Sequence, residues 1–261
     1  MNKNIINKKI YKNIIIIIIK IMETETQTNT SNISTKKIIA LAFQGENFSS
    51  KFLLCWTNTL SYLWQSGNYE FLIASGDNSS IFHSRLRTLG LNNEIQKPFN
   101  GAKFDYWITI DKNMLFTTQQ LLDMIESLEK HPIVSGLYKS DDAVSFFAVK
   151  ELDNDYFSRN GTFKYLTQDD LDNWKKEVDS KYIPVDFVGL SFFGMQSSVF
   201  DKLEYPYFNG DNLVIQKSDN LGTYNVVPSE DYNFCLKLKN AGYQVMLNTD
   251  LRLGNSVNLI I

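Results

Sequence analysis

Short apolar runs alternate with amphipathic segments through the first half of this chain, and that alternation constrains the fold more than any other feature. Four runs have the length and composition of buried strands: residues 37–43 (KIIALAF), 69–75 (YEFLIAS), 104–110 (FDYWITI) and 133–138 (IVSGLY). Three segments between them repeat apolar side chains at helical spacing: residues 52–64, 81–89 and 117–130. Strands that alternate with helices predict an α/β domain with a mainly parallel central sheet flanked by helices.

The second half of the sequence is less regular. Further strands are expected at residues 143–151 and 243–248, and residues 185–208 suit a buried strand with a packed helix. Residues 153–181 are polar and indicate an excursion over the surface with one short helix, whereas residues 209–227 indicate a loop. Ser229 is typical of an N-cap and predicts a helix over residues 230–240.

Residues 1–35 differ from the remainder and predict a disordered, low-complexity leader, which leaves residues 36–261 as a single domain. The isoleucine run at 14–19 is far shorter than the roughly 20 apolar residues that a membrane-spanning helix needs. Lys12 precedes the run, as in a signal peptide or anchor, but no small-residue cleavage site follows it. The sequence therefore favours a soluble cytoplasmic protein without a membrane span, and leaves Met22 as an alternative start.

Composition excludes several classes of function. The chain has 26 Lys and Arg against 29 Asp and Glu, so it lacks the basic surplus that binds nucleic acid by bulk charge. Its 43% of hydrophobic residues are enough for a sizeable core. The only cysteines and histidines are Cys55, Cys235, His83 and His131. These numbers exclude a disulfide scaffold, a Cys-rich zinc module and a multi-His metal site.

Acidic side chains follow two of the predicted strands. Asp77 and Asp111 each come directly after an apolar run. Ligands of parallel sheets bind beyond the carboxyl ends of the strands, so both residues are expected on the ligand side. In extended backbone, Asp111 and Asn113 would face one site while Lys112 points aside. The alternative is an ordinary turn, which Asp and Asn also favour.

Two further segments carry candidate chemistry. Glu230 and Asp231 open the helix predicted after Ser229, although acids in a first helical turn also complement the helix dipole. Residues 185–208 hold Gly189 and Gly194, where backbone could come close to a ligand. The same residues suit a buried strand with a packed helix.

In this order, the segments resemble GT-A fold glycosyltransferases, particularly the family 2-like enzymes. Such enzymes have an apolar strand that ends in Asp-x-Asp, a later VGxxF segment followed by VFxxLxYPxF, and a helix of the form EDxxFCxxLxxAGY. The likeness extends over residues 37–255. It implies a GT-A (Rossmann-like) domain that moves a sugar from a nucleotide-sugar donor to a hydroxyl of a glycan, a protein or another acceptor.

The resemblance also implies roles for individual residues. Asp77 takes the place of an acid near the nucleotide base or ribose, and Arg85 that of an arginine facing the donor diphosphate. Asp111 matches the first acid of Asp-x-Asp. Asp231 matches the general base of inverting members, and Glu230 beside it is an acceptor contact.

Two positions depart from the family pattern. Asn113 replaces the second acid of Asp-x-Asp, and Asn255 occupies the closing strand where many members have a metal-binding His. Hard cations prefer charged carboxylates, so Mn²⁺ or Mg²⁺ is expected to bind weakly, through Asp111, Asn113 and Asn255.

These departures leave three alternatives open. The chain can bind a cation weakly through Asp111, or neutralise the diphosphate with cationic side chains, for which the candidates are Arg85, Lys112 and Lys139. It can also be a degenerate domain that binds nucleotide or glycan without turnover. A nucleotidyltransferase is disfavoured because residues 44–47 form no basic glycine-rich loop.

Overall fold

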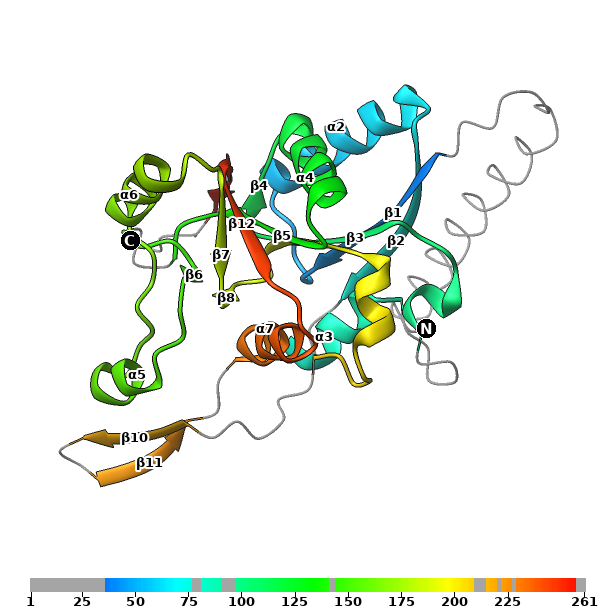
Figure 1. Ribbon diagram of the computed structural model, residues 1–261. Helices are drawn as coiled ribbons and strands as arrows, with labels where there is room; N and C mark the ends of the chain where they lie inside the picture. The colour runs from blue at the N-terminus through cyan, green and yellow to red at the C-terminus, as the bar shows by residue number, and fades with distance from the viewer. Residues whose placement is uncertain are drawn as a thin grey trace. The chain divides into compact units, whose positions relative to one another are not determined.

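A seven-stranded mixed sheet forms the centre of the computed structural model (Figure 1). In spatial order its strands are β2 (Tyr69–Gly76), β1 (Lys37–Gln44), β3 (Tyr106–Asp111), β9 (Phe192–Gln196), β5 (Ile133–Leu137), β12 (Val245–Arg252) and β7 (Tyr182–Val185). Only β9 and β7 pair antiparallel with their neighbours, so five of the seven strands run in one direction. The α/β class and the mainly parallel sheet are thereby confirmed.

The structure describes residues 36–76, 81–90, 97–140, 144–208, 215–219, 222–226 and 229–256. These residues belong to one compact unit, Lys36–Ile261. The predicted leader, residues 1–35, lies outside the described residues. No helix in the described ranges is long and apolar enough to cross a bilayer.

Helices cover both faces of the sheet (Figure 1). On one face lie α2 (Ser50–Ser66) and α4 (Thr118–Lys130), and on the other lie α3 (Ile81–Thr88) and α7 (Glu230–Asn240). Side-chain caps fix three of these starts: Ser49, Thr117 and Ser229 each accept a hydrogen bond from a backbone N–H of the first turn. The helix predicted after Ser229 is therefore confirmed as α7.

The connections of β1 create a switch point in the sheet. The chain passes from β1 through α2 to β2 on one side, and then through α3 to β3 on the other side of β1. Because these helices lie on opposite faces, the carboxyl ends of β1 and β3 form the topological switch point, where sheets of this kind bind ligands. Gln44 and Asp111 are paired there at the two strand ends.

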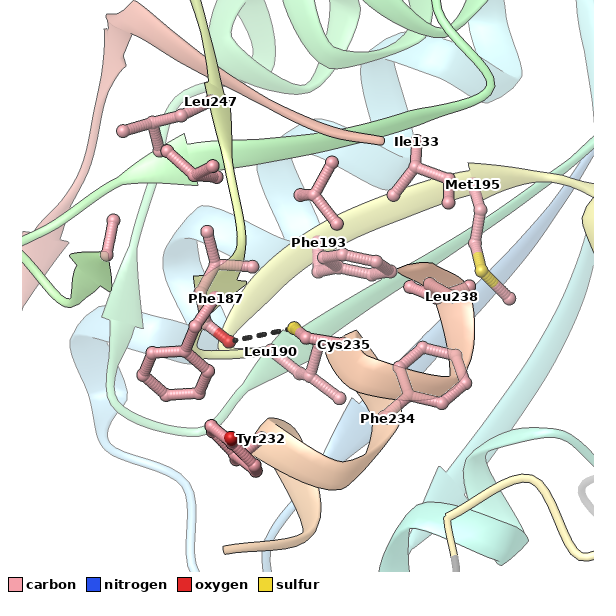
Figure 2. Packing of buried hydrophobic residues seen from close by; sticks show 14 of the residues in the cluster. Ile133, Phe187, Leu190, Phe193, Met195, Tyr232, Phe234, Cys235, Leu238 and Leu247 are labelled. Carbon is pink, nitrogen blue, oxygen red and sulfur yellow. Dashed lines mark hydrogen bonds between the residues drawn. The ribbon is translucent and has the colours of Figure 1, made fainter. Parts of the chain in front are cut away.

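Aromatic and aliphatic side chains pack together in the core between the sheet and α7 (Figure 2). Phe193 of β9 and Phe234 of α7 are both fully buried, with ring centroids 6.1 Å apart in an edge-to-face arrangement. Next to them, the Sγ of Cys235 lies 3.5 Å from the carbonyl oxygen of Val188 as a hydrogen-bond donor (Figure 2). Cys235 and Cys55 are both free thiols. This packing anchors α7, and with it the start of the helix, against the sheet.

Phe193→Ala is expected to lower the free energy of unfolding by about 3–5 kcal/mol, because it opens a cavity in this core. The matched control is Trp64→Ala on α2, whose side chain is 55% exposed; it is expected to change stability by at most about 0.5 kcal/mol. Urea denaturation of the two variants checks both values. Equal effects would mean that the core is not packed as described.

Residues 153–181 contain two helices, so the prediction of one short helix was wrong. They are α5 (Asn154–Asn160) and α6 (Gln168–Val178). Asp153 caps α5, and Thr167 with Asp170 forms a capping box at the start of α6. Both helices are stabilised at their starts by polar caps. The apolar periodicity of this segment is weak, so the capping residues mark these helices better than the hydrophobic pattern does.

Three other expectations in the second half need correction. The strand expected over residues 143–151 is limited to β6 (Ala148–Val149), which pairs with β8 (Phe187–Val188). Residues 185–193 are divided between β7, β8 and β9. In the range predicted as a loop, β10 (Ile215–Asp219) and β11 (Gly222–Val226) form an antiparallel hairpin. The short elements not yet named are η1 (Pro98–Gly101), β4 (Met114–Leu115), η2 (Ser197–Lys202) and β13 (Gly254–Asn255).

Candidate functional site

Three charged side chains from distant parts of the sequence meet at the switch point. Asp111 is the last residue of β3, Asp231 lies in the first turn of α7, and Arg85 lies in the last turn of α3. Arg85 is only 2% exposed, whereas the side chains of Asp111 and Asp231 are 24% and 13% exposed. The two carboxylates therefore reach solvent while the guanidinium lies behind them.

Arg85 bridges the two carboxylates. Its Nη1 donates to Oδ1 of Asp111 at 2.9 Å and its Nη2 to Oδ2 of Asp111 at 3.3 Å, a bidentate pair. Nη2 also lies 3.5 Å from Oδ1 of Asp231. Burial acts to lower the pKa of Arg85, but the charges of Asp111 and Asp231 outweigh it and raise that pKa. Arg85 is therefore a permanent positive charge inside the fold.

The backbone before β9 fixes the carboxylates from the other side. Leu190 N–H donates to Oδ2 of Asp231 at 3.0 Å, and Ser191 Oγ donates to Oδ2 of Asp111 at 2.9 Å. Ser191 N–H donates to the hydroxyl of Tyr138 at 3.4 Å. Each carboxylate thus has a guanidinium on one side and residues 190–191 on the other, which sets its orientation.

Negative charge exceeds positive charge in this cluster. Glu230, half-buried beside Asp231, adds a third carboxylate to the single guanidinium. Burial raises the pKa of Asp231 to about 6; Arg85 opposes this shift, and the charge of Glu230 adds to it. Near neutral pH, Asp231 is therefore a carboxylate that accepts a proton more readily than an ordinary aspartate.

The turn after β3 differs from the extended backbone assumed for Asp111, Lys112 and Asn113. The chain turns at Lys112 and Asn113, and the side chain of Asn113 is exposed. Lys112 N–H donates to the carbonyl of Gln44, and its side chain packs against Gly45, where an added Cβ would lie 2.5 Å from it. The expectation of extended backbone through Asn113 was therefore wrong, because the strand ends at Asp111 and the chain turns after it.

The other predicted positions fall in different surroundings. Asp77 lies outside the described residues. Lys139 donates to the carbonyl of Val144, and its Nζ lies 4.2 Å from the ring centroid of Phe146. The resemblance places Arg85 against the donor diphosphate, yet both of its terminal nitrogens contact carboxylates in the structure.

Asn113 and Asn255 are brought together by two short strands. β4 pairs with β13, which sets Asn255 opposite Met114, and Ser256 N–H donates to the carbonyl of Asn113 at 2.8 Å. Oδ1 of Asn255 is buried and has no hydrogen-bond partner in the described chain. Among the described residues, no group of three His, Cys, Asp or Glu side chains could hold a metal ion. Both Asp111 oxygens also accept hydrogen bonds from Arg85 or Ser191, so this donor set does not fit a resident divalent cation.

Sequence reasoning did not find Ser191 or Tyr138. The sequence feature that could have pointed to them is the glycine-rich segment around Gly189. Its glycines had suggested that the backbone there comes close to a ligand. In the structure the close approach is to Tyr138 and Phe147: a Cβ on Gly189 would lie 2.1 Å from the Tyr138 hydroxyl. Gly189 is needed so that this segment can lie against the ring of Tyr138.

Comparisons with known proteins show a distant likeness in fold only. No protein-family profile matches the sequence, and no curated protein matches it. The crystal structure of A197 from STIV aligns over 86% of this chain and 96% of its own, with 14% identity and a TM-score of 0.44. A mutant Drosophila β-1,4-galactosyltransferase 7, in complex with manganese, UDP-Gal and xylobiose, aligns over 85% of this chain and 71% of its own, with 13% identity and a TM-score of 0.37. These values assign neither a family nor a reaction.

Proposed function

We propose that this chain is a glycosyltransferase that moves a sugar from a nucleotide-sugar donor to a hydroxyl group of an acceptor. One observation carries the proposal: Asp111 and Asp231, 120 positions apart, meet through Arg85 at the switch point of the sheet, the edge at which such sheets bind ligands. The sequence resemblance assigns these two positions to the donor site and to the general base.

The local chemistry supports Asp231 as the base. As the acceptor hydroxyl attacks the anomeric carbon, a C–O bond forms to the acceptor and the C–O bond to the donor phosphate breaks. The hydroxyl proton passes to the carboxylate of Asp231, and the nucleoside diphosphate leaves. A pKa of about 6 suits this task near neutral pH, because the group is ionised yet basic. Arg85 and the N–H of Leu190 hold the carboxylate in one orientation.

The proposal is tested by incubating the full chain with a panel of nucleotide sugars, with and without disaccharide acceptors, and measuring release of nucleoside diphosphate. Turnover that depends on an acceptor and on Asp231 supports the proposal. Binding of nucleotide without turnover would support the second candidate, a degenerate domain that binds nucleotide or glycan. The engagement of both Asp111 oxygens by Arg85 and Ser191 favours that second candidate.

The pH dependence of transfer is expected to follow Asp231. Transfer needs the ionised carboxylate, so kcat/KM is expected to fall tenfold per pH unit below about pH 6 and to level off above it. Rates measured from pH 4.5 to 8.5 at constant ionic strength check the profile. A profile that is flat through pH 6 would exclude Asp231 as the base.

Metal dependence is expected to be weak. Calorimetric titration of the free protein with Mn²⁺ is expected to show no tight binding, because Asn113 and Asn255 supply neutral oxygens. Tight binding to the unmodified chain would contradict this expectation.

A further inference from the structure

A pocket of about 400 Å³ lies apart from the Arg85 cluster, between α6 and the segments around residues 150–153 and 164–166. Four partly or fully buried side chains form its floor: Tyr165, Leu166, Trp174 and Ile183. Exposed charged side chains surround this apolar floor. The volume falls in the range of small-molecule sites, and the combination of an aromatic floor with polar walls is typical of them.

The charges around the pocket select among ligand classes. Its acidic residues are Glu151, Asp153, Asp170 and Glu177. Only two lysines, Lys150 and Lys164, oppose these four acids. An anionic ligand such as a nucleotide or a sulfated glycan would therefore meet net repulsion.

A cationic ligand is also disfavoured, because the position that it would take is already filled. The Nζ of Lys150 lies 5.1 Å from the ring centroid of Trp174, so a cation already stacks on that indole. A neutral ligand with both an apolar face and several hydroxyl groups suits the remaining surface. Its apolar face can pack on the floor of the pocket. Its hydroxyls can bond to the carboxylates of Glu151 and Glu177 and to the side-chain amide of Asn173.

Several wall side chains are available for such bonds. Within the described part of the chain, no hydrogen bond or ion pair engages the side chains of Glu151, Asn173 or Glu177. Asn173 and Glu177 lie one turn apart on α6, so both can bond neighbouring groups of one ligand. Asp153 and Asp170 are less available because they cap α5 and α6.

We propose that this pocket binds a neutral pyranose unit of a glycan, with its apolar face packed on the floor beside the ring face that Lys150 covers and its hydroxyls bonded to side chains of α6. A row of stacked rings links the pocket to the candidate site. The ring centroid of Tyr165 lies 5.5 Å from that of Phe147, which lies 6.2 Å from that of Tyr138. The inference goes beyond sugar transfer, because a glycan can bind here whether or not the Arg85 cluster is catalytic.

The test measures binding alone, in the absence of any nucleotide sugar. The full chain is titrated with maltose and cellobiose by saturation-transfer NMR and calorimetry, with spermidine and UDP as the cationic and anionic probes. Saturable binding of a disaccharide is expected, and Trp174→Ala is expected to weaken it by at least about tenfold, because it removes the largest apolar side chain of the floor. Trp64→Ala, at an exposed indole on α2, is the matched control and is expected to leave binding unchanged.

A second variant covers the case in which Trp174→Ala fails to fold. Asn173→Ala with Glu177→Ala removes only exposed α6 side chains, so the fold is expected to persist and disaccharide binding to fall severalfold. Absence of disaccharide binding, disaccharide binding that both variants leave unchanged, or binding of UDP or spermidine that Trp174→Ala abolishes would overturn the proposal. UDP that binds Trp174→Ala and the unmodified chain alike occupies another site, as the proposed transferase expects, so the two proposals fail separately.

Discussion

Asp231→Asn is expected to reduce the rate of sugar transfer by roughly 10²–10⁴-fold, the usual contribution of a general base, while donor affinity is unchanged. The amide keeps the shape of the carboxylate and can still accept the N–H of Leu190, but it cannot take the acceptor proton. The matched control is Asp250→Asn, which neutralises an exposed carboxylate paired with Lys175. Single-turnover rates and calorimetric titration with a nucleoside diphosphate separate chemistry from binding.

Stability measurements distinguish this catalytic role from a structural one. A carboxyl whose pKa is raised on folding stabilises the protein at low pH, and that contribution is lost as the pH rises through about 6. At pH 8 the ionised Asp231 therefore lowers the free energy of unfolding. Asp231→Asn is expected to unfold at the same or a higher urea concentration than the unmodified chain. At pH 5 the two are expected to converge. A variant that is markedly less stable at pH 8 would mean that Asp231 holds the fold together.

The meeting of Asp111 and Asp231 at one edge was predictable because it depends on local signals. An apolar run identifies the strand that ends at Asp111, and Ser229 marks the start of the helix that carries Asp231. Parallel strands end at one edge of a sheet, and a helix that leads into another parallel strand, as α7 leads into β12, begins at that same edge. The exact partner of each acid was not predictable. Arg85 and Arg87 both lie in the last turn of α3, and only tertiary packing buries the first and exposes the second.

Contacts between distant segments account for the remaining gaps. Ser191 and Asp111 are 80 positions apart in the sequence, and the periodicity of neither segment predicts the hydrogen bond between them. The two helices of residues 153–181 depend on their caps more than on an apolar stripe, so a search for hydrophobic periodicity undercounts them. Turn chemistry at Lys112 likewise overrides the strand alternation that had aligned Asp111 with Asn113.

Arg85→Met is expected to lower the free energy of unfolding at pH 8 by about 3–5 kcal/mol, the usual cost of removing one partner from a buried ion pair. The change leaves Asp111 and Asp231 facing each other without the guanidinium that now bridges them. The loss is expected to shrink at pH 5, where the carboxylate of Asp231 takes up a proton. Urea denaturation at both pH values measures it, with Arg87→Met, at the exposed neighbour on α3, as the control.

Neutralising the carboxylates in the same variant separates charge from packing. If unpaired charge causes the loss, Arg85→Met combined with Asp111→Asn and Asp231→Asn is expected to recover most of the stability at pH 8. None of the three substituted side chains carries a charge. If the triple variant is as unstable as Arg85→Met alone, the guanidinium acts mainly through packing and its hydrogen bonds to Thr109 and Leu190. Recovery would show that the charge of Arg85 offsets the two neighbouring carboxylates. A general base beside an anionic donor needs such an opposing charge.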